Sequence, residues 1–209
     1  MKILFIYILI LFNYISYSYA SESNNEKTVI FIRHGEKPLN VEIGQINCKG
    51  LNRSLKLPKV LVQKFGKPNF IFAPNPSDQI EKKQQKFSYN RPLSTIEPTA
   101  IQLGLPTNTL FGFTDVKRLS NEILSEKYNN SLIFVSWEHN KLVEIVKYIY
   151  TKDKNNKETD IPDWPTIKYD DIYILKIKKE NSSYQIKFTQ DKQNLDNQSE
   201  VCPFPIDSK

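Results

Sequence analysis

Cysteine and histidine are scarce in this chain, which has only two of each among its 209 residues. Neither Cys48 nor Cys202 has another cysteine or a histidine at the spacing of a zinc ligand set, so we expect no metal site. The chain also has no visible internal repeat and no recognisable nucleic-acid-binding motif. These absences leave an ordinary globular domain as the working interpretation.

The formal charge of the chain is +6, which favours anionic ligands in general. Its lysines are spread along the sequence, for example at Lys82–Lys83 and Lys178–Lys179, and are mixed with asparagine and glutamine. No aromatic ladder accompanies them, as a single-stranded nucleic acid would require. We therefore interpret the lysines as a solvated basic surface and expect no nucleic-acid partner.

The sequence lacks an apolar run of the roughly 20 residues that a membrane-spanning helix needs. Its longest apolar segment, Ile3–Phe12, follows a single lysine and precedes the small residues Ser18 and Ala20. This pattern is typical of a signal peptide cleaved after residue 20, rather than of a lasting membrane anchor. A lipoprotein would need a cysteine next to the cleavage site, and the sequence has none there. We expect a periplasmic or secreted protein whose single domain covers residues 21–209.

Both cysteines belong to the expected mature protein, where an oxidising compartment favours a disulfide. A Cys48–Cys202 bond would tie the segment after the first sequence motif to the C-terminal tail. Two free thiols are the alternative, and the sequence alone leaves both open.

Hydrophobic patterns predict strands that alternate with helices. Strands are expected at residues 28–32, 69–73, 107–111 and 131–137, followed by an antiparallel hairpin at 171–178 and 183–189. Helices are expected at residues 51–65, 94–103, 114–128 and 139–150, with Ser94 capping the second. The polar stretch 77–90 is interpreted as a surface loop or exposed helix. This order predicts an α/β fold with a mainly parallel sheet covered on both faces.

Each of the two histidines directly follows or closely follows an apolar strand. His34 lies within Arg33-His34-Gly35-Glu36, and His139 follows the strand that ends at Trp137. Ligands of open α/β sheets bind beyond the carboxyl ends of the strands, so one pocket can hold both histidines. The alternative is that each histidine is structural. A nucleophilic imidazole, a cation and a glycine that leaves backbone room are what phosphoryl transfer needs.

The arrangement of these residues resembles the histidine phosphatase superfamily, which includes phosphoglycerate mutases and histidine acid phosphatases. Arg33-His34-Gly35-Glu36 matches its signature, while Arg91 and His139 match its second arginine and second histidine in order. The resemblance covers residues 27–150. It implies a three-layer α/β/α sandwich of the phosphoglycerate mutase type.

The resemblance also implies roles for these residues. His34 would attack phosphorus and become a phosphohistidine, while Arg33, Arg91 and His139 would hold the phosphoryl oxygens. Positioned cations of this kind account for much of the catalysis of phosphoryl transfer, so no metal or other cofactor is expected. Glu36 is expected to orient Arg33 or a nearby backbone amide.

The proton donor and a third arginine are the remaining candidate site residues. Asn140 stands where the acid phosphatases have their aspartate donor, so Glu138 is taken as the donor. Arg53 lies near the start of an expected helix, whose N-terminus favours anions, and is taken as a phosphate ligand. A surface role is the alternative for Arg53.

These residues together predict a metal-independent phosphomonoesterase acting outside the cytoplasm. Its substrate is expected to be a small phosphomonoester or a phosphorylated peptide. The alternative, favoured by the missing aspartate, is a non-catalytic or weakly active protein that binds phosphate ligands in the same pocket. A mutase is a third interpretation, which export from the cytoplasm disfavours.

Overall fold

The computed structural model describes residues 25–82 and 84–204, and the expected signal peptide lies outside them. Six strands form one sheet in the order β5-β2-β6-β1-β7-β8. The strands β1, β2, β5 and β6 are parallel to one another and comprise Glu26–Arg33, Phe70–Phe72, Thr107–Asn108 and Leu132–Trp137. The strands β7 (Asp171–Glu180) and β8 (Ser183–Lys192) form the antiparallel hairpin that completes the sheet.

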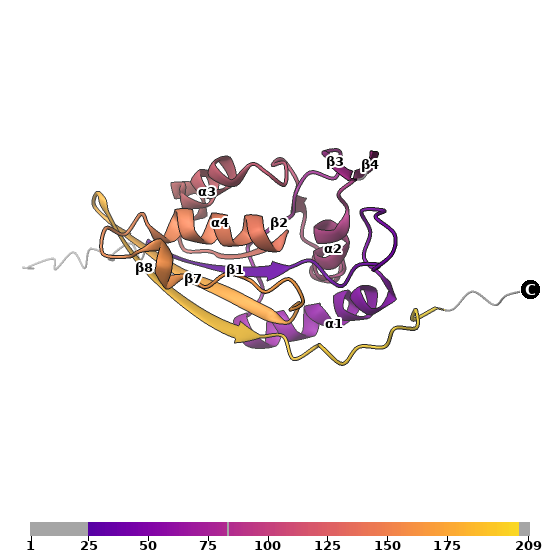
Figure 1. The fold of residues 1–209 in the computed structure, drawn as a ribbon. Coiled ribbons are helices and arrows are strands. Elements are labelled where there is room, and N and C mark those ends of the chain that lie inside the picture. Colours follow the sequence, from indigo (N-terminus) through magenta and orange to yellow (C-terminus); the bar gives the residue numbers. More distant parts are fainter. Residues whose placement is uncertain (1–24, 83, 205–209) are drawn as a thin grey trace, which may run out of the picture.

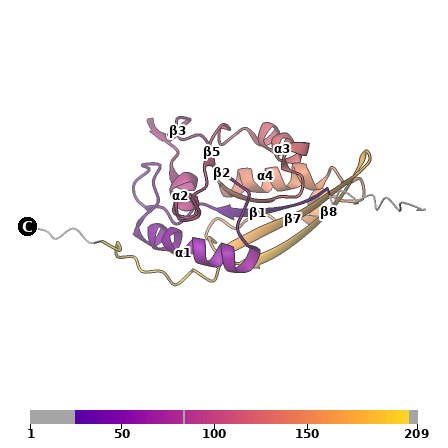
Figure 2. The same cartoon turned by 180° about the vertical axis from the view of Figure 1, so that it is seen from behind.

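Helices cover both faces of this sheet (Figures 1 and 2). The helices α1 (Cys48–Phe65) and α2 (Arg91–Leu103) pack over Ile30 and Ile32 of β1. The helices α3 (Val116–Leu124) and α4 (His139–Tyr150) pack over Val29 and Phe31 on the other face. Because alternate residues of β1 are apolar on both faces, the strand is buried between two cores. The predicted three-layer sandwich is confirmed.

Some predicted boundaries differ from the structure. Helix α2 begins at Arg91 rather than Ser94, because Pro92 fits the first turn of a helix, where no backbone N–H is needed. Helix α1 continues through Pro58. The third expected helix ends at Leu124, and a 3-10 turn at Glu126–Tyr128 follows. A second 3-10 turn lies at Glu158–Asp160.

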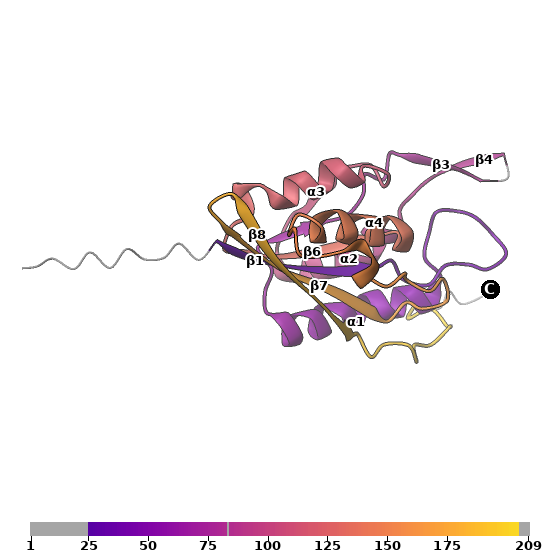
Figure 3. The same ribbon diagram turned by 60° about the vertical axis from the view of Figure 1, so that its left-hand side comes forward.

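The polar stretch 77–90 forms neither a loop nor a helix throughout. It contains a separate two-stranded hairpin, β3 (Gln79–Lys82) with β4 (Gln85–Ser88), which projects beyond the main body (Figure 3). Ile80 pairs directly with Phe87 across the two strands. The expectation of a loop or helix was wrong. The stretch is rich in lysine and glutamine, and one apolar pair is too few to give the alternating pattern by which a strand is recognised in a sequence.

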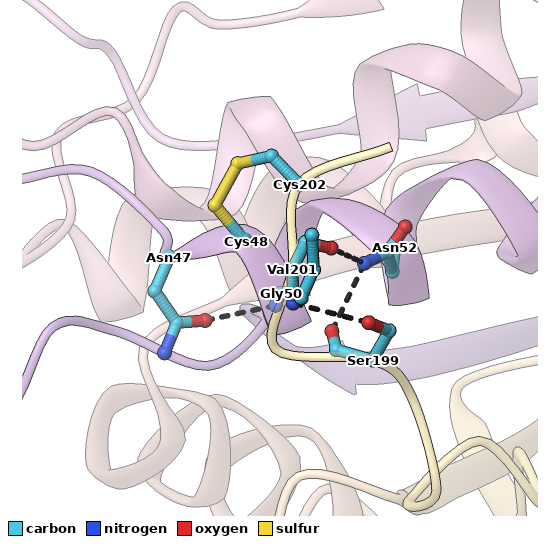
Figure 4. The surroundings of a disulfide bond; sticks show 7 residues. All are labelled: Asn47, Cys48, Gly50, Asn52, Ser199, Val201 and Cys202. Carbon is cyan, nitrogen blue, oxygen red and sulfur yellow. Dashed lines mark hydrogen bonds between the residues drawn. A yellow bond between two sulfur atoms is a disulfide. The ribbon is translucent and has the colours of Figure 1, made fainter. Parts of the chain in front are cut away.

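The C-terminal tail crosses helix α1 and is fastened to it (Figure 4). A disulfide joins Cys48 to Cys202, whose Cα atoms lie 4.6 Å apart. Asn52 Nδ2 donates to the carbonyls of Ser199 (2.9 Å) and Val201 (2.8 Å). Of the two alternatives left open, the structure therefore has the disulfide. None of the helices within the described residues has the length and apolar character of a membrane span.

Candidate active site

The two histidines lie at the carboxyl ends of neighbouring parallel strands. Strands β1 and β6 pair in a register that places Arg33 opposite Trp137. The His34 backbone N–H donates to the Trp137 carbonyl at 3.0 Å, directly beyond this pair. The segment that follows each strand, His34 after β1 and Glu138–His139 after β6, therefore starts at the same edge of the sheet.

These segments line one cavity of about 370 Å³. Five of the six predicted site residues border it: Arg33, His34, Arg91, Glu138 and His139. The rest of its wall consists of residues of the β3–β4 hairpin together with Lys37, Glu42, Tyr89, Asn140 and Thr166. A larger cavity of about 520 Å³ lies between helices α3 and α4, but it contains neither histidine. The candidate active site is therefore identified by the residues that line the cavity and not by the volume of the cavity.

The His34 ring is buried and its tautomer is fixed. Its Nδ1 lies 2.8 Å from the Gly35 carbonyl oxygen, which can only accept a hydrogen bond. Burial, together with the charges of Arg33 and Arg91, lowers the pKa of His34 to about 3, although the Gly35 hydrogen bond and Glu138 oppose the shift. The ring is therefore neutral near pH 7, with the proton on Nδ1 and the lone pair on Nε2.

Arg33 is held by the segment that leads into β7. Its Nη1 donates to the carbonyls of Thr166 (2.6 Å) and Lys168 (2.9 Å), and its guanidinium stacks on Tyr169 at 3.9 Å. Its Nε is buried without a hydrogen-bond partner in the described structure. The guanidinium is thus fixed at the cavity wall, and one of its buried N–H groups has no partner among the described residues.

Arg91 enters the cavity from the first residue of helix α2. Its Nη2 donates to Glu42 Oε2 at 2.7 Å, and its Nε donates to the Gln45 carbonyl at 3.3 Å. The ring of Tyr89 lies 5.6 Å from the guanidinium carbon and 6.0 Å from the His34 ring. Burial raises the pKa of Tyr89 well above its ordinary value, so the phenol stays protonated.

A single threonine joins the nucleophile motif to helix α2. Thr95 Oγ1 accepts from the Gly35 N–H at 2.8 Å and donates to the Arg91 carbonyl at 2.8 Å. Ser136 of β6 donates to the Pro92 carbonyl at 2.9 Å, which fixes the same turn of α2 to the sheet. The relative position of His34 and Arg91 therefore depends on buried hydrogen bonds.

Glu138 caps helix α4 and contacts His139. Its Oε2 accepts from the Lys141 N–H at 2.9 Å. Its Oε1 lies 2.6 Å from His139 Nδ1, in a direction too oblique for a regular hydrogen bond. Burial opposes ionisation of Glu138, but the contacts with His139 and with backbone amides prevail and lower its pKa to about 2. In the unliganded protein Glu138 is therefore a carboxylate.

The structure does not bring Arg53 to the cavity. Its guanidinium is fully buried beneath the motif and pairs with Glu36 through two bonds, of 2.7 and 3.0 Å. Asp170 (3.1 Å), Gln193 (2.9 Å) and Asp196 (2.9 Å) are its other partners. With all these donors occupied, Arg53 supports the motif from below, and Glu36 orients Arg53 rather than Arg33 or a nearby backbone amide.

Sequence reasoning missed several residues of this site. Glu42, Tyr89 and Tyr169 were not singled out, because no motif marks them. Tyr89 offered a weak signal through its place two residues before Arg91. Tyr169 offered no signal. It lies beneath Arg33 only because the segment that leads into β7 passes next to the end of β1.

No protein-family model matches the chain, and neither does any curated protein sequence. Solved structures do match it. A mycobacterial hydrolase superposes with a TM-score of 0.53 at 11% identity, covering 78% of this chain and 89% of its own. A mycobacterial glucosyl-3-phosphoglycerate phosphatase gives 0.51 at 8% identity, covering 78% and 96%. A phosphoglycerate mutase from Bacillus anthracis gives 0.51 at 10% identity, covering 80% and 94%.

The chain shares the fold of these three proteins. The resemblance predicted from the sequence is thus confirmed at the level of the fold. In this α/β fold, the candidate site lies at the carboxyl edge of the parallel strands, where such folds bind their ligands.

Proposed function

We propose that this protein is a metal-independent phosphomonoesterase that works through a phosphohistidine on His34. The observation that carries the proposal is the state of the His34 ring. The Gly35 carbonyl accepts a hydrogen bond from Nδ1–H, and the lowered pKa keeps the ring neutral, which leaves Nε2 as a nucleophile. Arg33, Arg91 and His139 border the same cavity and supply groups that bind phosphoryl oxygens.

The reaction proceeds in two displacements. His34 Nε2 attacks phosphorus, the ester P–O bond breaks, and the departing oxygen takes a proton. Water then attacks the phosphohistidine, releasing inorganic phosphate and the neutral ring. Arg33 and Arg91 stabilise the charge that develops on the phosphoryl oxygens in both steps.

We assign the proton donor role to Glu138. Its lowered pKa keeps it ionised in the unliganded protein, so it needs a proton before it can donate one. A bound phosphate dianion raises the pKa of a neighbouring carboxylate by like-charge repulsion. The donor is thereby generated by substrate binding. Glu138→Gln is expected to slow the release of an alkyl alcohol more than that of an activated phenol, and equal slowing contradicts the role.

The ionised state of Glu138 also favours a second candidate, a weakly active protein that binds phosphate ligands in the same pocket. Turnover distinguishes the two functions. The purified protein should release phosphate from a panel of phosphomonoesters with a chelator present, and His34→Ala should abolish that release. Loss of wild-type activity in the chelator would contradict the metal-independent mechanism.

The intermediate gives a direct test. After incubation with a ³²P-labelled phosphomonoester and an alkaline quench, the protein should carry a label that is stable in base and lost in acid. The chain has only one other histidine, so His139→Asn is the matched control. Label that maps to His139, or that survives in His34→Ala, argues against His34 as the nucleophile.

We further propose that a signal peptide ends at Ala20, that residues 21–209 form one domain, and that the protein acts in the periplasm or outside the cell. The Cys48–Cys202 disulfide supports an oxidising compartment. N-terminal sequencing of the protein recovered from cell fractions tests this. A mature protein that starts at Met1 in the cytoplasmic fraction refutes the proposal.

A further inference from the structure

The cavity is polar at its phosphate-binding end and apolar where the β3–β4 hairpin borders it. Arg33, His34 and Arg91 supply the polar end. The hairpin contributes Ile80, Glu81 and Phe87 to the other part of the wall. Glu81 is exposed and is paired across the strands with Lys86, whereas the apolar Ile80 and Phe87 are half-buried. Since these two form a directly opposed cross-strand pair, their side chains lie on the same face of the hairpin.

The apolar pair is held in place by the loop that follows the nucleophile motif. Gly44 in this loop has φ +70° and packs directly against the hairpin. A Cβ at this position would lie 2.9 Å from Phe87 Cδ2 and would collide with the Ser88 carbonyl oxygen. The Asn90 N–H also donates to the Gly44 carbonyl at 3.1 Å. These contacts with the Gly44 loop fix the position of Phe87, although the hairpin itself projects from the main body.

The charged side chains nearest this wall lie close to groups of opposite charge. Glu81 Oε2 of the hairpin lies 4.0 Å from Lys86 Nζ. Lys37 Nζ lies 3.3 Å from Glu42 Oε1, and the other oxygen of Glu42 bonds Arg91. Ile80 and Phe87 remain half-buried and have no side-chain polar atoms to recognise a sugar hydroxyl or a second anion. Their contact with a ligand gains free energy only by removing apolar surface from water.

We propose that the substrate is a phosphomonoester whose organic part is apolar and packs against Ile80 and Phe87. The inference rests on the proposed function, since it places the phosphoryl group at His34. The hairpin is then the element that selects the substrate, while the strand ends supply the chemistry.

Binding of n-alkylphosphonates from methyl to hexyl tests the proposal without requiring turnover. Each methylene that reaches the wall should lower Kd by about fourfold, the effect of burying one CH₂. Phe87→Ala and Ile80→Ala should each flatten this series while leaving methylphosphonate affinity unchanged. Lys86→Ala, at an exposed position of the same hairpin, is the matched control and should keep the wild-type slope.

A flat series in the wild-type protein overturns the proposal, and so does a rising series that neither variant alters. Absence of phosphate release from the corresponding alkyl phosphates, with a rising phosphonate series, would instead refute the proposed catalysis and leave apolar recognition supported. The two failures are therefore distinguishable.

Discussion

Glu42 occupies one of the arginine donors that the proposed substrate needs. Its carboxylate lies 2.7 Å from Arg91 Nη2, on the wall of the same cavity. A phosphoryl dianion that binds Arg91 must therefore compete with this carboxylate or tolerate its charge. We therefore expect Glu42 to act as an internal competitor that weakens the binding of inorganic phosphate, the product of the proposed reaction.

Removing that charge should strengthen phosphate binding. Glu42→Gln keeps the size of the side chain, and the competitive Ki of inorganic phosphate should fall about tenfold, because a like charge has left the site. Glu144→Gln, which removes the same charge from the surface of α4, controls for net charge. An increase in Ki would show instead that Glu42 serves mainly to hold Arg91 in place.

The burial of His34 makes stability depend on pH. Its pKa is lowered to about 3, whereas an unfolded histidine titrates near 6.5. Between these values the unfolded chain binds a proton that the folded protein does not, so stability increases with pH across this window. From pH 5 to pH 7 the contribution of His34 is about 2 kcal/mol.

Urea denaturation at pH 5 and pH 7 measures this effect. His34→Asn should show a smaller pH dependence than the wild-type protein, by about 2 kcal/mol. Glu138, whose pKa is lowered from 4.5 to about 2, contributes mainly at lower pH, outside this window. Equal pH dependence in both proteins would mean that His34 is not buried in its neutral form.

At the scale of elements, helix α2 offers a controlled comparison between two buried threonines one turn apart. Thr95 Oγ1 accepts from Gly35 N–H, whereas Thr99 Oγ1 is buried without a hydrogen-bond partner in the described part of the chain. Thr95→Val leaves the Gly35 N–H unpaired, which should destabilise the protein by about 1–3 kcal/mol and lower kcat/KM. Thr99→Val should be neutral or stabilising. Thermal unfolding and phosphate release measure both, and equal effects would contradict the assigned role of Thr95.

The sequence predicted best those elements whose pattern is local. The continuous β-formers of β1 and β6 predicted buried parallel strands, and the residues directly after them proved to share one cavity. The β3–β4 hairpin was missed because its stability rests on a single apolar pair and on contact with Gly44, which lies far away in sequence. Local composition contains no information about such a contact.

Arg53 illustrates the same limit for a single residue. The sequence predicts that Arg53 is either a phosphate ligand near the start of a helix or a surface residue. The structure shows neither, because α1 begins at Cys48 and Arg53 is fully buried. Its partners Asp170, Gln193 and Asp196 flank the β7–β8 hairpin and lie 117 to 143 residues further along the chain. A buried arginine needs such partners, and their sequence separation hides them.

At the scale of the whole molecule, the C-terminal tail contacts the residues that support the nucleophile motif of the candidate active site. Asp196 pairs with Arg53, which pairs with Glu36 of the nucleophile motif. Six residues later, Cys202 is bonded to Cys48 at the start of α1. The motif, the first helix and the end of the described chain therefore form one connected unit, in which the disulfide keeps the tail from leaving α1.

Reduction of this disulfide should therefore weaken the fold as a whole. The bond closes a sequence separation of 154 residues, for which the chain-entropy model gives a stabilisation of about 5 kcal/mol. Denaturation in urea with and without reductant should show a loss of this order. The Cys48→Ala/Cys202→Ala double variant should resemble the reduced protein and show no response to reductant. If the reduced protein unfolds at the same urea concentration as the oxidised one, the disulfide does not contribute to the free energy of unfolding. The contacts of Asp196 and Asn52 would then suffice to keep the tail on α1.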